Sequence, residues 1–220
     1  MTVTQPRLSD IQALAAHHAL DLLGGFHPNA DDKTPETCKT LLMLGPAADF
    51  WTHINTSPEM KDGQPDPIDR WSTRVTNEIA KEINAEAAFP FGGPPYQPFY
   101  SWALRTARVW SSPVMFAVHD TQGLFVSFRS ALLLPYRIDL PATPDQAPCE
   151  ACAKPCLTAC PVGALTQDGY DVDKCHAYLD ISEGADCMSK GCAVRRVCPV
   201  GQDLRKPAQS AYHMSLFHKS

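Results

Sequence analysis

The chain has 220 residues, a formal net charge of -5 and nine cysteines. An acidic chain without a basic stripe is not expected to have a nucleic acid as a stable partner, because phosphate recognition needs clustered cations. The N-terminus has no signal-peptide pattern and the apolar runs are too short to cross a bilayer, so we expect no membrane partner and a cytoplasmic location.

The composition changes along the chain, because eight of the nine cysteines lie between Cys149 and Cys198. We therefore expect two domains rather than one. The predicted organisation is an α+β domain over residues 1–135, a proline-rich linker over 136–148 and a cysteine-rich domain over 149–220.

The first expected elements are a helix, a strand and a short helix. Ser9 can cap a helix that ends at Gly24-Gly25, since glycine provides the backbone freedom of a C-cap. The apolar run in residues 39–45 predicts a strand buried on both faces. Pro46 is expected to start a short helix that includes Trp51.

The middle of the chain predicts a long helix, an irregular loop and a hairpin. Asp66-Pro67 starts a helix whose apolar residues recur at three- and four-residue steps. The prolines and glycines of residues 89–100 predict an ordered loop, followed by a helix to about residue 109. Residues 114–119 and 124–134 are predicted to pair as a hairpin, with Gly123 at a positive φ. These elements predict a mixed domain with a mainly antiparallel sheet.

The cysteine spacing indicates iron–sulfur chemistry. Two segments end in the same Cys-Pro-Val-Gly sequence, at Cys160 and at Cys198, and a Cys-Pro that closes a short cysteine run is typical of two-cluster ferredoxins. In such proteins the cysteine before the proline binds the cluster of the other run. The predicted ligands of one 4Fe-4S cluster are therefore Cys149, Cys152, Cys156 and Cys198, and those of the other are Cys160, Cys175, Cys187 and Cys192.

Other interpretations of the cysteines remain open. Eight thiolates could also form two zinc sites, a single cluster beside structural cysteines, or disulfides. Cys38 lies outside the segment and is expected to be a buried small apolar residue. The cations in the segment could favour a reduced cluster or simply form a solvated helix face; they are Lys190, Arg195 and Arg196. His176 could bind iron but is expected to be a surface or supporting group.

Residues 160–165 (Cys-Pro-Val-Gly-Ala-Leu) together with residues 174–181 resemble the ferredoxin-like domain of epoxyqueuosine reductases. The resemblance covers residues 149–200, although the second Cys-x2-Cys-x3-Cys-Pro element of that family is absent. It implies two 4Fe-4S clusters that deliver electrons to a cobalamin in the preceding domain.

Residues 39–135 are similar in short motifs, at Asp66–Arg70 and from His119 to Pro135, to the cobalamin-trafficking and decyanating family. This resemblance implies a nitroreductase-like fold that holds a corrinoid or a flavin, with Arg129 near the cofactor. The other candidate residues for such a site are His119, Arg105 and Tyr100. The alternative is that these side chains only cover the core and pair with carboxylates. No dinucleotide fingerprint or P-loop is present, so direct nicotinamide binding is not expected.

The sequence thus predicts an iron–sulfur oxidoreductase component that relays single electrons from a soluble donor protein to a cofactor or substrate in the first domain. Such a component could itself be a reductase. Two alternatives stay open. The chain could be a plain ferredoxin-type carrier whose first domain docks a partner, or a structural protein stabilised by zinc.

Overall fold

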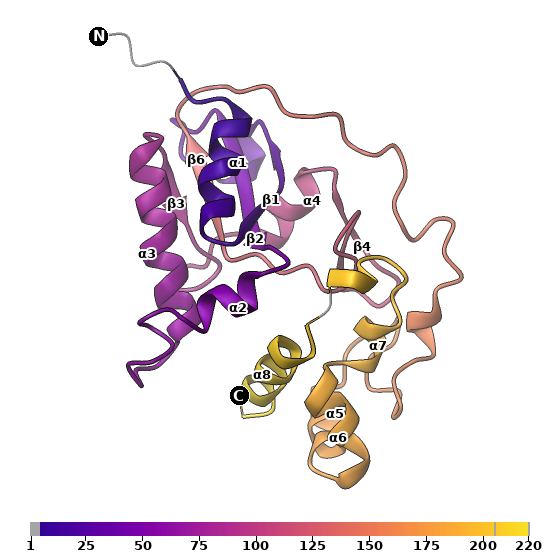
Figure 1. Ribbon diagram of the computed structural model, residues 1–220. Coiled ribbons are helices and arrows are strands. Elements are labelled where there is room, and N and C mark those ends of the chain that lie inside the picture. The colour runs from indigo at the N-terminus through magenta and orange to yellow at the C-terminus, as the bar shows by residue number, and fades with distance from the viewer. Residues whose placement is uncertain (1–4, 205, 220) are drawn as a thin grey trace. The chain divides into compact units, whose positions relative to one another are not determined.

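The computed structural model describes residues 5–204 and 206–219 (Figure 1). The chain divides into two compact units. Unit 1 contains the chain up to Arg108 and the segment Ser127–Thr143, whereas unit 2 contains Val109–Val126 and the chain from Pro144 onward. Residues 109–126, which the sequence analysis assigns to the first domain, therefore belong to unit 2. The α+β class with mainly antiparallel sheets is confirmed.

The core of unit 1 is a four-stranded antiparallel sheet with the strand order β1-β2-β6-β3. The strands are β1 (Leu20–Phe26), β2 (Thr40–Pro46), β6 (Ser130–Leu134) and β3 (Glu86–Ala88). The central strands β2 and β6 are almost fully buried because both faces of the sheet are covered. Their pairing places Leu41 opposite Leu133 and Leu42 opposite Leu132.

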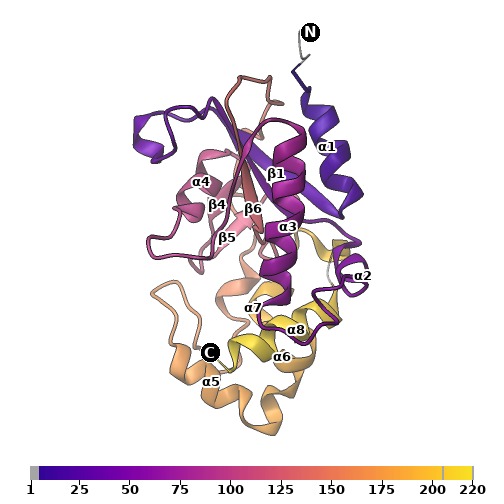
Figure 2. The same cartoon turned by 90° about the vertical axis from the view of Figure 1, so that its left-hand side faces the viewer.

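Helices cover this sheet on both faces. Figure 2 shows α1 (Leu8–His17) and α3 (Pro67–Glu82) on one face and α4 (Phe99–Arg105) on the other. The short α2 (Phe50–Ile54) and the 3-10 turn η1 (Ala30–Asp32) complete unit 1. The helix predicted after Asp66 is confirmed, and it buries the apolar face that its periodicity indicates.

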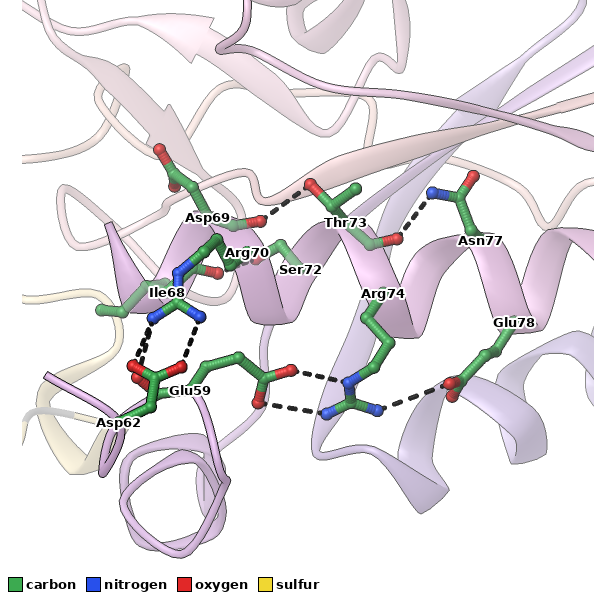
Figure 3. A network of polar contacts seen from close by, with 10 residues as sticks. All are labelled: Glu59, Asp62, Ile68, Asp69, Arg70, Ser72, Thr73, Arg74, Asn77 and Glu78. Carbon is green, nitrogen blue, oxygen red and sulfur yellow. Dashed lines mark hydrogen bonds and ion pairs between the residues drawn. The ribbon is translucent and has the colours of Figure 1, made fainter. Parts of the chain in front are cut away.

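Two ion pairs hold the N-terminal half of α3 to the preceding loop (Figure 3). Arg74 Nε donates to Glu59 Oε1 at 2.6 Å, and Arg70 Nη1 donates to Asp62 Oδ2 at 2.7 Å. Inside the core, the Thr76 and Ser130 hydroxyls lie 2.8 Å apart, and both residues are fully buried. This hydrogen bond joins α3 to β6 in the middle of an apolar layer.

Several predicted elements of the first domain were wrong. Pro46 is the last residue of β2 and does not start α2, which begins at Phe50. The helix predicted to reach about residue 109 ends at Arg105. The first helix ends at His17 instead of Gly25, because Ala19 has a φ of 54° and residues 20–26 pair with β2 as strand β1. Gly24 provides a positive φ inside this strand, at an irregularity of the register. The predicted hairpin does not form either, since residues 130–134 pair with β2 and β3. Gly123 does have the predicted positive φ, at 57°.

Unit 2 combines a small hairpin with short helical segments. Strand β4 (Val109–Ser111) pairs with β5 (Ala117–His119). The helical segments, in chain order, are η2 (Pro155–Leu157), α5 (Val172–Leu179), η3 (Ser182–Gly184), α6 (Ala185–Lys190), α7 (Ala193–Arg196), η4 (Gln202–Leu204) and α8 (Pro207–Phe217). A turn follows Cys160-Pro161. Helix α8 packs against α6.

The core of unit 2 contains residues from both of its chain segments. Val114, Val118 and Leu124 of the hairpin region form one buried cluster with the cysteine segment. The buried members from that segment are Cys156, Leu165, Val194 and Cys198. Two predicted cluster ligands thus lie in the apolar centre of this unit. None of the helices in residues 5–204 and 206–219 is both long and apolar enough to span a membrane.

Candidate cluster-binding sites

Cys149 lies close enough to three other cysteines for their charges to interact. Burial raises the pKa of the Cys149 thiol, and the thiolates of Cys152, Cys156 and Cys198 raise it further. Burial and two of the same neighbours, Cys152 and Cys198, also raise the pKa of Cys156. We call these four residues the first cysteine set. Ionisation of these buried, neighbouring thiols is therefore unfavourable unless a cation compensates their charge.

The other four cysteines line a single cavity of about 220 Å³ in unit 2. They are Cys160, Cys175, Cys187 and Cys192, which we call the second cysteine set. Burial raises the pKa of Cys175, and the thiolates of Cys192, Cys160 and Cys187 add to this increase. The structure therefore brings the eight cysteines together in the two groups of four that the crossover pattern predicts, while their role as ligands stays a prediction.

Backbone N–H groups point at the sulfur atoms of both sets. The Lys154 N–H donates to Cys152 Sγ at 3.3 Å, and Lys154 has a φ of 55° just before η2. The Ala164 N–H donates to Cys160 Sγ at 3.2 Å. Burial raises the pKa of Cys160, but hydrogen bonds from backbone N–H groups of residues 162–165 outweigh it and leave the pKa below its usual value. Such donors stabilise thiolate and cluster charge without a charged side chain.

The turn after β5 packs on the second Cys-Pro-Val-Gly loop. A methyl group added to Gly201 would lie 2.8 Å from the carbonyl oxygen of Gln122. His119 is fully buried at the start of this turn, and its Nδ1 accepts the backbone N–H groups of Thr121 and Gln122 at 3.1 and 3.3 Å. The sequence analysis missed this contact. Its only sequence signal is the glycine in each of the two loops, Gly123 and Gly201, both of which have a positive φ.

Tyr170 is a site residue that the sequence analysis did not single out. Its hydroxyl group hydrogen-bonds the Cys175 thiol, and its ring lines the cavity of the second set. An isolated bridge between Leu165 and Tyr170 fixes the backbone of this residue. The centroid of its ring lies 6.0 Å from that of Phe116 and 6.1 Å from that of Phe217, on which the ring stacks.

The three cations of the cysteine segment have different surroundings. Arg195 lines the cavity of the second set, and its Nε donates to the Leu124 carbonyl oxygen at 2.6 Å. Lys190 and Arg196 instead pair with Asp186 on α6. Of these three cations, only Arg195 faces the cysteines. Lys190, whose side chain is 59% exposed, instead lies on a solvated helix face.

His176 and Cys38 stay outside both cysteine sets. The His176 ring lies 4.6 Å from the Phe217 ring, and its Nε2 is buried without a hydrogen-bond partner in the described part of the chain. Cys38 is buried in unit 1, as predicted, and its thiol donates to the Thr40 carbonyl oxygen at 3.4 Å. Burial raises the pKa of Cys38 to about 11.

The four residues predicted to hold an organic cofactor lie in different surroundings. Arg129 is largely buried in unit 1 and pairs with Asp69 at 3.0 Å. Arg105 on α4 pairs with the buried Asp32 at 2.8 Å. On the same helix, Tyr100 is 47% exposed, whereas His119 belongs to unit 2. Both arginines pair with carboxylates, as the alternative expects, although Arg129 and Asp32 are largely buried. A corrinoid or flavin site stays a prediction.

In residues 5–204 and 206–219, no group of three or more His, Cys, Asp or Glu side chains is arranged to hold a single metal ion. The thiols of the second set surround a cavity instead of converging on one point. The chain matches no protein-family model, and no curated protein and no solved structure shows significant similarity to it.

Proposed function

We propose that the chain is an iron–sulfur oxidoreductase component that relays single electrons through two 4Fe-4S clusters. The observation that carries the proposal is the grouping of the eight clustered cysteines into two sets of four, one of which lines a cavity. Four thiolates are the ligand complement of one cubane cluster. When bound, the clusters would supply reversible one-electron chemistry.

The chain's own residues support the proposal in three ways. The thiols of Cys156, Cys187 and Cys198 are buried, so that the clusters would be shielded from water. Backbone N–H groups at Lys154 and Ala164 would donate to cluster-bound sulfur. Burial and N–H···S bonds are the main means by which a protein sets the potential of such a cluster.

A soluble electron-donor protein is the partner that this proposal requires. A corrinoid or flavin as the next acceptor, held near Arg129, remains the finer proposal from the resemblance of the first domain. Titration of the anaerobic protein with hydroxocobalamin, and separately with flavin mononucleotide, tests that acceptor. A spectral change or thermal stabilisation with one of them supports it, whereas no response to either favours a carrier whose first domain docks a partner.

The cluster proposal is tested by metal and sulfide analysis of the protein purified without oxygen. We expect about eight irons and eight sulfides per chain, and a spin–spin interaction signal from the reduced protein in electron paramagnetic resonance (EPR). Zinc in place of iron, with restored stability on zinc addition, would overturn the proposal and favour a structural metal protein.

Matched cysteine variants test the two sets. Cys152→Ser should remove about four irons and leave the second cluster, while Cys187→Ser should remove the other four. Cys38→Ser is the control, because this thiol is buried in the other unit and should leave the iron content unchanged. Loss of all iron from either cluster variant would contradict two independent sets.

A further inference from the structure

The two cysteine sets differ in the charge that lies next to them. Beside the second set, Arg195 is held between its hydrogen bond to the Leu124 carbonyl oxygen and the Phe125 ring, whose centroid lies 4.9 Å from the guanidinium carbon. Burial lowers the pKa of Arg195, but an arginine guanidinium stays protonated at physiological pH. A cation therefore lines the cavity of the second set.

The second set also has a side-chain hydrogen-bond donor. The Tyr170 hydroxyl donates a hydrogen bond to the Cys175 sulfur, and both residues line the same cavity. The aromatic contacts with Phe116 and Phe217 hold the Tyr170 ring in place. This O–H group stabilises negative charge at Cys175, which is itself half buried.

Two cysteines of the first set, Cys156 and Cys198, lie in the apolar core of unit 2. Val114, Val118 and Leu124 pack with Cys156 and Cys198 in one buried cluster. The cation that interacts with Cys149 is Lys154, an exposed residue whose charge is screened by solvent. The exposed Lys154 therefore stabilises additional negative charge at the first set less than the buried Arg195 does at the second.

We propose that Arg195 and Tyr170 give the cluster of the second set the higher reduction potential, so that electrons enter at the first set and leave from the second. This inference rests on the proposed function. A reduced cluster carries one more negative charge than an oxidised one, so a nearby buried cation and a hydrogen-bond donor favour the reduced form. If both clusters are bound, the cluster of the first set would give one electron to that of the second set and would itself be oxidised by one electron. A soluble one-electron donor protein then reduces the first set again.

A redox titration followed by EPR tests the inference. The Cys152→Ser background, in which only the second set is complete, identifies the signal of the second cluster. In the otherwise unchanged protein, this signal should appear at a higher potential than that of the first. Arg195→Gln should make reduction of the second cluster about tenfold less favourable, which is a shift of about 59 mV for one electron. Tyr170→Phe should lower the same potential, and it removes only a hydroxyl group.

The controls separate charge from structure. Lys190→Gln removes a neighbouring cation that is exposed and paired with Asp186, and it should leave both potentials unchanged. Arg195→Lys keeps the charge and should restore most of the potential. If Arg195→Gln does not assemble, Tyr170→Phe and the unmodified protein still decide the order of the two potentials.

The two possible failures are distinguishable. Fewer than about eight irons in the unmodified protein contradict the proposed function itself. Full iron content with the first cluster at the higher potential, or with no shift in Arg195→Gln and Tyr170→Phe, overturns only the inference on electron direction.

Discussion

Gly123 lies directly against the Cys198 thiol. A methyl group added to Gly123 would be 3.0 Å from Cys198 Sγ and 2.3 Å from the Val200 carbonyl oxygen. A carbon atom cannot approach a backbone oxygen so closely, so any side chain here must displace the loop that carries Cys198. The φ of 57° adds strain for a residue other than glycine.

Gly123→Ala should therefore lose iron from the first cysteine set, so that the iron content falls toward about half. Gly163→Ala is a matched control, because Gly163 has a similar φ of 61° in the other Cys-Pro-Val-Gly loop and only the end of Lys174 within 4.0 Å. The control should retain its iron. Iron and sulfide analysis of both proteins checks the prediction, and equal iron contents would contradict it.

The ion pair between Glu59 and Arg74 should make unit 1 more stable at neutral pH than in acid. The hydrogen bond from Arg74 lowers the pKa of Glu59 below the usual value of 4.5. The stabilisation is therefore fully present above pH 4.5 and is lost as the pH falls through the lower value of the folded state. Glu59→Gln should cost about 1 kcal/mol at pH 7 and almost nothing in strong acid.

Urea unfolding followed by the fluorescence of the buried Trp71 and Trp102 measures this difference in unit 1. The matched control is Glu78→Gln, because Glu78 also pairs with Arg74, at 3.5 Å, but is 54% exposed. We expect a smaller loss from the control. The same loss for Glu59→Gln at both pH values would show that packing and not charge is responsible.

The buried hydroxyl pair of Thr76 and Ser130 should show strong non-additivity. Thr76→Val leaves the Ser130 hydroxyl buried without this partner, which should cost about 1–3 kcal/mol. Ser130→Ala added to Thr76→Val removes the orphaned group, so the double variant should be less destabilised than the sum of the single variants. A double-mutant cycle from urea unfolding measures the coupling, and simple additivity would argue against the hydrogen bond.

Cys38 should react with alkylating reagents far more slowly than an exposed thiol. Burial raises its pKa to about 11, so the reactive thiolate is scarce at pH 8, and the side chain is only 7% exposed. Iodoacetamide labelling followed by peptide mass spectrometry should find Cys38 unmodified in the folded protein and modified after urea unfolding. Rapid labelling in the folded state would contradict its burial.

Local patterns predicted the elements whose formation depends mainly on nearby residues. Helix α3 follows from its proline start and helical periodicity, and the buried strand β2 follows from its short apolar run. These patterns involve only residues that are close in the sequence. Strand pairing is different. Leu41 pairs with Leu133 far along the chain, so the pattern of residues 124–134 could predict a strand but not its partner. The same reason explains why residues 20–26 were expected to be helical.

The cysteine sets illustrate the same limit at the candidate site. The repeated Cys-Pro predicted two groups of four, because ligand spacing is a local property. The inward position of Arg195 was not predictable, since it depends on the carbonyl oxygen of Leu124, which lies 71 positions earlier. Tyr170 was missed for a similar reason, because its contact with Cys175 follows from the folding of the loop between them.

The alternation of the chain between its two units has a consequence for synthesis on the ribosome. Val114, Val118 and Leu124 emerge before their buried partners at Cys156 and Cys198. The hairpin must therefore wait, with its apolar side chains uncovered, until the last third of the chain has been made. For the same reason, cleavage at residue 135 would leave this hairpin on the N-terminal fragment and the cysteine segment on the C-terminal one. Neither fragment would then contain the complete core of unit 2.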